Sequence, residues 1–534
     1  MLFSSHFCCY SPLEVRVVRI RSIVVGLSIL SLGITACSGG RSALPGTASA
    51  PVTGEPTSGV WRLIHSHSVQ PQSFTGANIG FLLTDGTVLA QTGGSTWYRY
   101  TPDANGDYSK GTWKQAASLP SGYSPDAGAS NVLADGRVIM SGGEYNFGSF
   151  ALTNLGAVYD PVADTWTSLG HPKAWGWIGD SPSSMLPDGR MLLGQKISKR
   201  DAVLNPKTLQ WKDLPRQNGK ADFNAEEGWT LLPDGTILTI DVKNDPNSEI
   251  YNPSTNQWKS AGKTPVTLAS HWTSGGCISY GPKKRDCYYP PGEIGPAVLR
   301  PDGTVFATGS GQAGSGYGLG HTAIYHTRGS LAGKWSAGPD FPNNDNAGDS
   351  YAVLEPNGNV LVFGDSGRVY EWDGTTFGQA GLSWSGPPLL LPTGQVMMLG
   401  RTVALYTPTG QPQASWAPKI KNCPANVSAG QTYKITGTQF NGLSQVMAFG
   451  DEYQNATNYP LVRITNDASG HVFYARTHDH SSMGVATGST LVWTYFDVPS
   501  GIDTGASHLV VVANGIPSKS VAVTVSSSGR IKRR

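Results

Sequence analysis

Six acidic residues of this chain share one position in a repeated pattern, seven to nine residues before a turn such as Asp-Gly. If they converge, their charges repel one another unless a cation or hydrogen bonds intervene. Such a set suits an oxygen-ligated divalent cation such as calcium, or a cationic or polyhydroxylated ligand. Alternatively, each carboxylate caps its own loop by accepting backbone N–H groups. The six residues are Asp126, Asp180, Glu226, Glu227, Glu293 and Asp349.

A second candidate is the sequence His478-Asp479-His480. Residues two apart on an extended strand point to the same side, so both imidazoles could share a metal ion. The sequence identifies no third ligand. The alternative is a hydrogen-bonded structural pair of histidines.

The turns recur seven times, and each joins two short apolar runs, as between Val132 and Met140. Asp-Gly and Asn-Gly favour tight hairpins because glycine accepts the positive φ that the turn requires. After the second run come Gly, a Tyr followed by Asx-Pro or Thr-Pro, and then a Trp, which predicts four strands per unit. The turns are Asp85-Gly86, Asp135-Gly136, Asp188-Gly189, Asp234-Gly235, Asp302-Gly303, Asn357-Gly358 and Thr393-Gly394.

Units of about fifty residues with four short strands are typical of propeller blades, each of which buries its faces against its neighbours. We therefore predict a seven-bladed β-propeller over residues 59–418, with a strand around Trp61 that helps to close the ring. In such a fold the first strand of every blade carries the chain from one face to the other. Residues at one spacing before the turns would then gather at one mouth of the channel.

From about Lys419 the repeats give way to apolar strands that predict an immunoglobulin-like β-sandwich over 419–527, followed by a basic tail at 528–534. The composition favours an all-β protein, with 67 Gly, 36 Pro and only 14% charged residues. A net charge of +2 gives no reason to expect nucleic-acid binding. We expect a monomer.

The doubled Gly and the spaced Tyr and Trp resemble kelch repeats, as at Gly93-Gly94, Tyr100 and Trp113. With the C-terminal domain, the chain resembles the galactose oxidase and glyoxal oxidase family. The resemblance implies an axial copper ion, held by a Tyr crosslinked to Cys, a Tyr beside a His, and a His from the last domain.

The residues at the corresponding positions differ from this ligand set. Gly76-Ala77 stands where the Cys is expected, Asp126-Ala127 where the crosslinked Tyr is expected, and Trp384-Ser385 where the Tyr-His pair is expected. His478 alone could match the histidine of the last domain. The radical cofactor needs its Cys–Tyr pair, so we do not expect copper-radical chemistry.

The N-terminal sequence predicts export. Arg16, Arg19 and Arg21 precede an apolar run that is too short to span a bilayer comfortably, as in a secretory signal. The run ends in Ile-Thr-Ala-Cys, which resembles a bacterial lipobox, so we expect lipidation at Cys37. Residues 1–36 would be the signal peptide and 37–58 a flexible tether. An ordinary signal peptide, and hence a secreted protein, is the alternative.

Cysteine spacing also suits an oxidising compartment. Cys277 and Cys287 bracket a short loop and could form a local disulfide, although pairing of either with Cys423 stays open.

Together these features predict a cell-envelope lipoprotein, at the outer membrane or cell surface, whose propeller binds a glycan or a protein partner. The alternative is an extracellular enzyme of the galactose oxidase-like class, either an oxidase with a rearranged metal site or a hydrolase or lyase that uses the axial carboxylates. A purely structural surface protein is a third reading.

Overall fold

The computed structural model describes residues 59–64, 76–271, 278–280, 286–288, 292–313, 316–383, 386–450 and 455–527. All described residues belong to one compact unit. Among these residues no helix is both long enough and apolar enough to cross a membrane.

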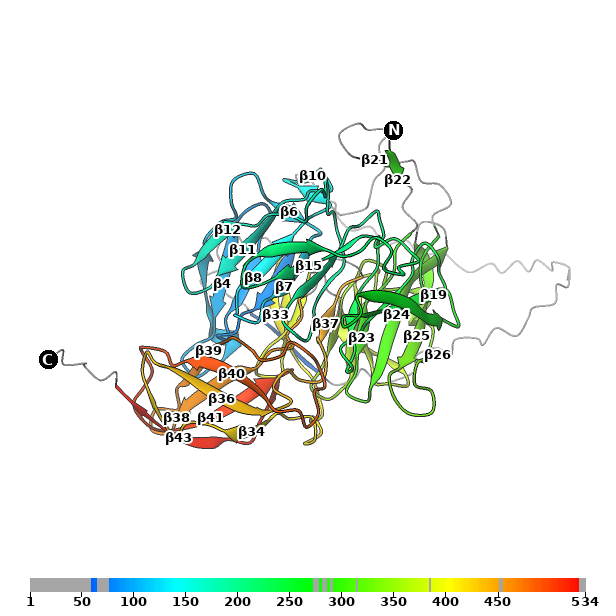
Figure 1. Cartoon of the computed structure of the whole chain (residues 1–534). Helices are drawn as coiled ribbons and strands as arrows, with labels where there is room; N and C mark the ends of the chain where they lie inside the picture. Colours follow the sequence, from blue (N-terminus) through cyan, green and yellow to red (C-terminus); the bar gives the residue numbers. More distant parts are fainter. Residues whose placement is uncertain are drawn as a thin grey trace, which may run out of the picture. The chain divides into compact units, whose positions relative to one another are not determined.

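Seven antiparallel sheets account for the repeats, each with four strands from its own repeat except where β1 completes the last, and we number them 1 to 7 in chain order (Figure 1). Sheet 1 contains β2 (Ile79–Leu82), β3 (Val88–Gln91), β4 (Trp97–Thr101) and β5 (Thr112–Ala116). Sheet 2 contains β7 (Ala129–Val132), β8 (Val138–Ser141), β11 (Gly156–Asp160) and β12 (Thr165–Ser168). Sheet 3 contains β13 (Ser183–Met185), β14 (Met191–Gly194), β15 (Asp201–Asn205) and β16 (Gln210–Asp213).

The remaining four sheets repeat this order. Sheet 4 contains β17 (Thr230–Leu231), β18 (Ile237–Ile240), β19 (Asn247–Asn252) and β20 (Gln257–Lys263). Sheet 5 contains β23 (Ala297–Leu299), β24 (Thr304–Ala313), β25 (Tyr317–His326) and β26 (Lys334–Ala337). Sheet 6 contains β27 (Ala352–Leu354), β28 (Val360–Phe363), β29 (Arg368–Trp372) and β30 (Phe377–Ser383). Sheet 7 contains β31 (Pro388–Leu390), β32 (Val396–Leu399), β33 (Val403–Thr407) and β1 (Val60–Leu63).

Strand β1 closes the ring, as predicted from the sequence around Trp61. It pairs antiparallel with β33, which places Trp61 opposite Tyr406. The two ring centroids lie 4.6 Å apart. Sheet 7 is thus built from both ends of the repeat region, and its first strand, β31, contacts β2 of sheet 1.

The recurring Tyr and Trp form cross-strand pairs within the outer half of a sheet. Tyr100 lies opposite Trp113, and Tyr251 lies opposite Trp258. Their ring centroids are 4.8 and 5.2 Å apart, and both tyrosine side chains are fully buried. Aromatic pairs of this kind contribute about 0.5–1.5 kcal/mol beyond their buried area. This packing explains why the spacing of Tyr and Trp repeats in the sequence.

The Asp-Gly turns adopt the expected hairpin geometry. In the first turn Gly86 has φ +75°, and its N–H donates to the Leu83 carbonyl at 2.9 Å. The Asp85 carboxylate accepts the N–H of Thr87 at 3.1 Å. The turn prediction is therefore confirmed in its physical detail.

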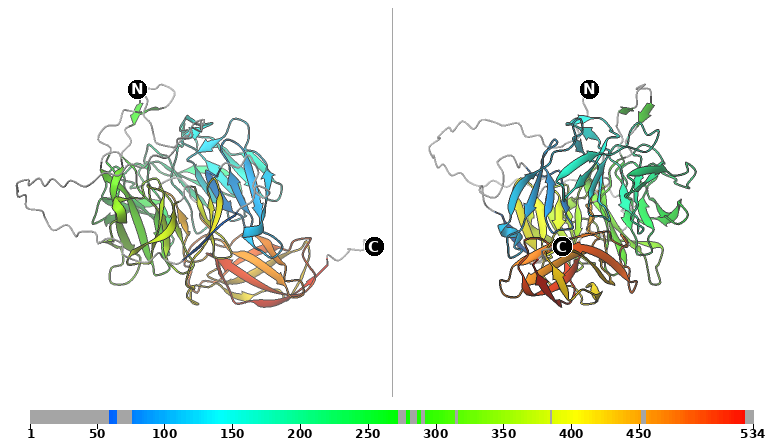
Figure 2. Two further views of the ribbon diagram at one scale, coloured as in Figure 1. Left: turned by 180° about the vertical axis from the view of Figure 1, so that it is seen from behind. Right: turned by 60° about the vertical axis from the view of Figure 1, so that its left-hand side comes forward.

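The C-terminal domain is also all-β (Figure 2). Its strands pair in the order β34-β36-β40-β39-β38-β41-β43-β35, with β42 beside β41. All these pairs are antiparallel except β35 with β43. The immunoglobulin-like assignment stays a prediction. The strands are β34 (Lys419–Asn422), β35 (Asn426–Ser428), β36 (Thr432–Thr438), β38 (Leu461–Asn466), β39 (Val472–His478), β40 (Val492–Asp497), β41 (Gly505–Ala513), β42 (Ile516–Pro517) and β43 (Val521–Ser526).

One segment of this domain reaches the first strands of several sheets. Strand β37 (Met447–Ala448) pairs with β27 and extends sheet 6 to five strands. The Gln445 side chain accepts the N–H of Leu231 at 2.8 Å, and the Asn455 amide donates to the Gly80 carbonyl at 2.6 Å. We call residues 441–450 and 455–459 the axial segment, because groups in both parts contact the innermost strands of separate sheets.

Short elements complete the described structure. A small sheet next to sheet 2 contains β6 (Pro125–Asp126), β9 (Tyr145–Asn146) and β10 (Ser149–Phe150), and β21 (Ile278–Tyr280) pairs with β22 (Asp286–Tyr288). Two 3₁₀ turns, η1 (Tyr108–Lys110) and η2 (Pro342–Asn344), lie in loops.

Candidate functional site

A residue with positive φ precedes the first strand of every one of the seven sheets. Most are glycine, but Ala127, Glu226 and Asp349 hold this conformation with side chains, at φ +51°, +59° and +48°. Such backbone costs of order 1 kcal/mol for residues other than glycine and often occurs at functional sites. The seven residues are Gly76, Ala127, Gly179, Glu226, Gly292, Asp349 and Gly386.

Lys196 links two of the predicted carboxylates. Its Nζ atom forms ion pairs with Asp180 and with Glu226, the latter at 2.7 Å. The three side chains are buried, yet the second oxygen of Asp180 has no hydrogen-bond partner. Lys196 comes two residues after β14, which returns the chain to the end from which β13 starts.

Glu293 and Asp349 form a coupled pair of carboxyl groups. Burial is the main cause that raises the pKa of Asp349 to about 7, followed by the charges of Glu226 and Glu144. Burial and the charge of Asp349 raise the pKa of Glu293 well above its ordinary value. The interaction with Glu293 favours the charged form of Asp349.

Two further carboxylates belong to the same cluster. Burial raises the pKa of Glu144, and the charges of Glu226 and Asp126 act in the same direction, against that of Lys196. We call this set the axial mouth. It joins six carboxyl groups and one ammonium group, from Asp126, Glu144, Asp180, Lys196, Glu226, Glu293 and Asp349.

Solvent reaches the axial mouth on one side. Asp349 keeps exposed surface although protein groups surround its carboxylate, whereas Asp126, Glu144 and Glu293 are half-buried and Asp180 is only 3% exposed. A ligand could therefore contact Asp349 while Lys196 and its partners form the base of the site. Asp126 also accepts the N–H of Ala127 at 3.1 Å, so local capping occurs at this position.

The structure brings together five of the six carboxylates selected from the sequence, and Glu227 is the exception. Its side chain is fully buried in another cluster, where both oxygens contact Lys220 Nζ at 2.8 and 3.0 Å. Burial, more than any nearby charge, raises the pKa of Glu227 well above its ordinary value. The left-handed backbone at Glu226 separates these neighbours, so including Glu227 in the axial set was wrong.

Sequence reasoning missed Glu144 and Lys196. Both follow the second strand of a sheet, Glu144 three residues after β8 and Lys196 two residues after β14. An antiparallel second strand returns the chain to the end where the first strand began. Counting forward from the turns, as well as backward, would have found both residues.

His478 and His480 lie near the turns that follow the first strands of the sheets. The backbone N–H of His480 donates to the Ala134 carbonyl at 3.0 Å. The assumed extended strand ends at His478, and Asp479 has φ +50°. The two imidazoles accordingly have different surroundings. His478 contacts Asp479 at 2.8 Å and Asp497 at 3.2 Å.

His480 is buried and hydrogen-bonded to Thr494 at 2.9 Å. Burial, and then the charge of His478, lowers the pKa of His480 to about 3. These contacts match the structural-pair alternative, and the geometric premise of the two-histidine metal site does not hold.

The axial residues do not fit the copper site that the family resemblance implies. Ala77 and Ala127 offer no donor side chain at the positions of the Cys and the crosslinked Tyr. The axial segment contains no histidine, and its described contacts come from groups such as Gln445 and Asn455. Trp384 and Ser385 lie outside the described residues, as do residues 451–454.

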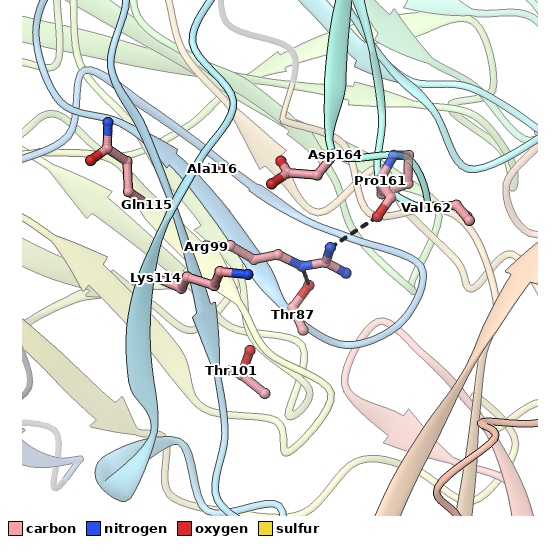
Figure 3. A pocket seen from close by; sticks show the side chains of 9 residues that line it. All are labelled: Thr87, Arg99, Thr101, Lys114, Gln115, Ala116, Pro161, Val162 and Asp164. Carbon is pink, nitrogen blue, oxygen red and sulfur yellow. Dashed lines mark hydrogen bonds between the residues drawn. The ribbon is translucent and has the colours of Figure 1, made fainter.

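A groove of about 300 Å³ lies between the outer strands of sheets 1 and 2 (Figure 3). Its central side chain, Arg99, donates to Thr87 and to the Pro161 carbonyl, each at 2.9 Å. Arg137 makes the same kind of contact between sheets 2 and 3, at 2.7 Å from the Pro206 carbonyl. This groove is therefore a feature of how neighbouring sheets join.

Several predicted features fall outside the described residues. They include the signal peptide, Cys37, the tether over residues 37–58 and Cys277, and no side chain is described for Cys287. Cys423 is half-buried and forms no disulfide with any described side chain, and burial raises its pKa to about 11.

No family model matches the chain. It is similar to N-acetylneuraminate epimerases of Haemophilus influenzae strains 86-028NP and PittEE, each 26% identical over 157 residues. Each match covers 29% of this chain and 39% of the relative.

Solved structures with a similar fold include a fungal alcohol oxidase of the AA5 family in complex with copper. That oxidase is 14% identical, with a TM-score of 0.47, over 88% of this chain and 99% of its own. Virginiamycin B lyase from Staphylococcus aureus is 11% identical, with a TM-score of 0.41, over 65% of this chain and 99% of its own. The repeated four-stranded sheets of this chain form a kelch-type β-propeller, and its likeness to these solved structures concerns the fold alone.

Proposed function

We propose that this chain is an exported lipoprotein, attached to the cell envelope through Cys37, whose axial mouth binds a glycan without copper-radical chemistry. The observation that carries this proposal is the axial mouth itself. Its carboxylates converge around Lys196, and Asp349 is open to solvent. Carboxylates accept hydrogen bonds from sugar hydroxyls, and Lys196 orients two of them.

The charge of the mouth restricts the class of glycan. Six carboxyl groups against one ammonium leave the site negative even when Glu293 keeps its proton. A ligand with its own carboxylate would be repelled, so the proposed ligand is a neutral or amino sugar. The relatives are named for N-acetylneuraminate, which is an acid. We propose a different ligand class for this chain.

A glycan array with the full-length protein tests this proposal. We expect binding to neutral or amino sugars, loss of that binding in Asp349→Asn, and little binding to acidic sugars. Metal analysis of the same protein should show no stoichiometric copper. Preferential binding of sialylated glycans, or one copper ion per chain, would contradict the proposal.

A second candidate is a proton-transfer enzyme acting on a sugar, and it is favoured by the Glu293–Asp349 pair. A carboxyl group with a pKa of about 7 can accept a proton near neutral pH. Two coupled carboxyl groups can share such a proton, whereas a retaining glycosidase uses two carboxyl groups roughly 5 Å apart in separate roles. For this second candidate we therefore favour a lyase-type step over glycoside hydrolysis.

Hydrogen–deuterium exchange into a bound sugar distinguishes the two candidates. An enzyme would exchange carbon-bound hydrogen at a rate that Asp349→Asn abolishes. A binding protein would show no exchange above the buffer rate.

A further inference from the structure

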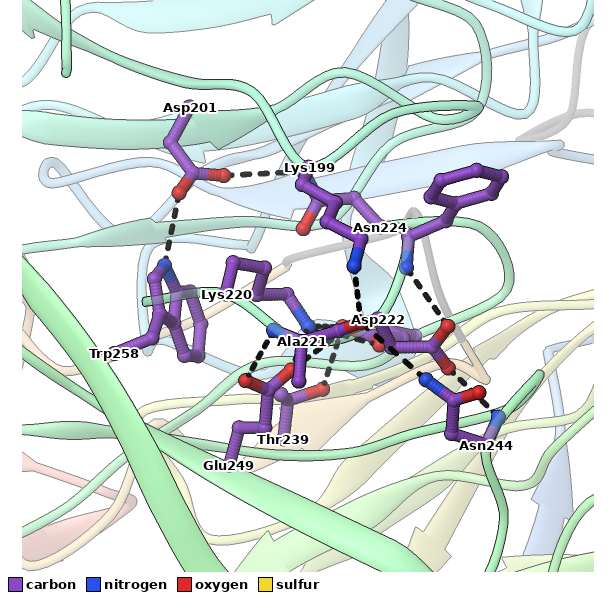
Figure 4. Close-up of polar contacts among 12 residues, drawn as sticks. Lys199, Asp201, Lys220, Ala221, Asp222, Asn224, Thr239, Asn244, Glu249 and Trp258 are labelled. Carbon is purple, nitrogen blue, oxygen red and sulfur yellow. Dashed lines mark hydrogen bonds and ion pairs between the residues drawn. The ribbon is translucent and has the colours of Figure 1, made fainter. Parts of the chain in front are cut away.

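A second group of carboxylates is formed by loops and strands of sheet 4, and Figure 4 shows Asp222, Glu249 and Lys220 of this group. Asp222, Glu227 and Asp241 each offer an oxygen atom, and these atoms lie within 4.8 Å of one another. Glu249 of β19 and Lys220 complete the set, which we call the sheet 4 cluster. Lys220 Nζ contacts Glu249 at 2.7 Å.

The cluster carries more negative charge than its lysine can balance. It contains four carboxyl groups and one ammonium group, and Lys220 pairs directly with Glu227 and Glu249. Asp222 is held by two backbone N–H groups, those of Phe223 at 2.8 Å and Asn244 at 3.0 Å. These bonds fix the orientation of the Asp222 carboxylate.

Asp241 supplies an independent observation. Its side chain is buried, at 1% exposure, and neither of its oxygens has a hydrogen-bond donor. Leaving a buried carboxylate without donors costs several kcal/mol. Asp241 follows β18 directly and belongs to the set of close oxygens. A cation coordinated by these oxygens would remove this cost.

We infer that the sheet 4 cluster binds one divalent cation of the calcium or magnesium class through Asp222, Glu227 and Asp241. The donors are all carboxylate oxygens, which hard cations prefer, and no described cysteine or histidine lies in the set. Oxygens up to 4.8 Å apart can share an ion that lies about 2.3–2.6 Å from each of them.

The inferred site would hold the loop that leads to the axial mouth. Lys220, Asp222 and Glu227 stand in the segment before β17, and Glu226 in the same segment points to the mouth. Cation binding at Glu227 would restrain the strained backbone at Glu226. The inference does not depend on what the axial mouth binds.

The competing explanation is a shared proton, with Asp241 protonated and donating to Glu249. Asp241→Asn separates the two explanations, because an Asn amide can also donate to Glu249 but removes a charged ligand. Asp345→Asn is the matched control. Asp345 is another buried carboxylate, but Ser366 and Tyr370 already donate to it.

The test is metal analysis of the full chain, followed by thermal unfolding with EDTA and then with calcium, magnesium or manganese added back. We expect about one divalent ion per chain and a Tm that falls by several degrees in EDTA and recovers with the ion. Asp241→Asn should lose this response, and Asp345→Asn should keep it.

Two results would overturn the inference. One is a native protein that holds no divalent ion and whose Tm does not change with EDTA or added ions. The other is an Asp241→Asn variant that responds as the native protein does. The native measurement stands even if the variant fails to fold.

Discussion

Two lysines of this propeller, Lys196 and Lys220, make the same contacts in different surroundings. Each pairs with two carboxylates, and the two clusters are joined through the adjacent residues Glu226 and Glu227. The Lys220 side chain is fully buried, whereas the axial mouth around Lys196 opens to solvent at Asp349. Similar groups of charges can therefore form a ligand site or stabilise the interior of the fold, depending on whether water and ligands can reach them.

The largest expected effect comes from Lys220→Met. This change removes the ammonium and leaves Glu227 and Glu249 buried without their partner. Breaking a buried ion pair in this way typically costs about 3–5 kcal/mol. Urea unfolding should show this loss in the free energy of unfolding. A loss below about 1 kcal/mol would contradict the structural role of the sheet 4 cluster.

Lys196→Met is the matched change in the axial mouth, and we expect a smaller loss of about 1–3 kcal/mol. The Lys196 and Asp180 side chains are 5% and 4% exposed, against 0% for Lys220 and Glu227, and water at the open side of the mouth can rehydrate the released carboxylates. Glycan binding should weaken at least tenfold, because Asp180 and Glu226 lose the group that orients them. Equal stability losses for Lys196→Met and Lys220→Met would remove the distinction between the clusters.

The smallest expected effect is a change in how stability depends on pH, and Asp349→Asn tests it. The pKa of Asp349 is about 7 when folded and about 3.9 when unfolded. Between these values the native state holds a proton that the unfolded chain has lost, so stability falls as pH rises towards 7. Because the side chain is exposed, screening reduces the effect to about 1 kcal/mol.

Asparagine tolerates positive φ and cannot ionise, so Asp349→Asn should flatten this part of the stability curve. Urea unfolding of both proteins at pH 5 and pH 8 gives the comparison. Identical pH dependence in the two proteins would show that Asp349 titrates normally.

The sequence predicted the parts of the molecule that repeat. Asp-Gly turns locate the hairpins because glycine must adopt positive φ there, and their spacing placed Asp180 and Asp349 at one end of the strands. Lys196 was missed because only the residues before each first strand were counted. Glu227 was wrongly assigned to the axial mouth because the side chains of adjacent residues can belong to different clusters.

Contacts that do not recur from repeat to repeat could not be predicted from the spacing of the turns. Gln445 reaches Leu231 across more than two hundred residues, and no local pattern signals that contact. Nor did spacing reveal the sheet 4 cluster, since Asp222 and Asp241 come from different loops. Such pairs meet only when the sheets pack.

Glycan binding at the axial mouth is tested most directly by calorimetry, which measures the affinity of the full chain for a neutral or amino-sugar glycan selected on the array. Glu226→Gln should weaken binding at least tenfold. Lys114→Gln, in the groove between sheets 1 and 2, should leave the affinity unchanged. Unchanged affinity in Glu226→Gln, together with weaker binding in Lys114→Gln, would place the ligand in the groove. That result would contradict binding at the axial mouth.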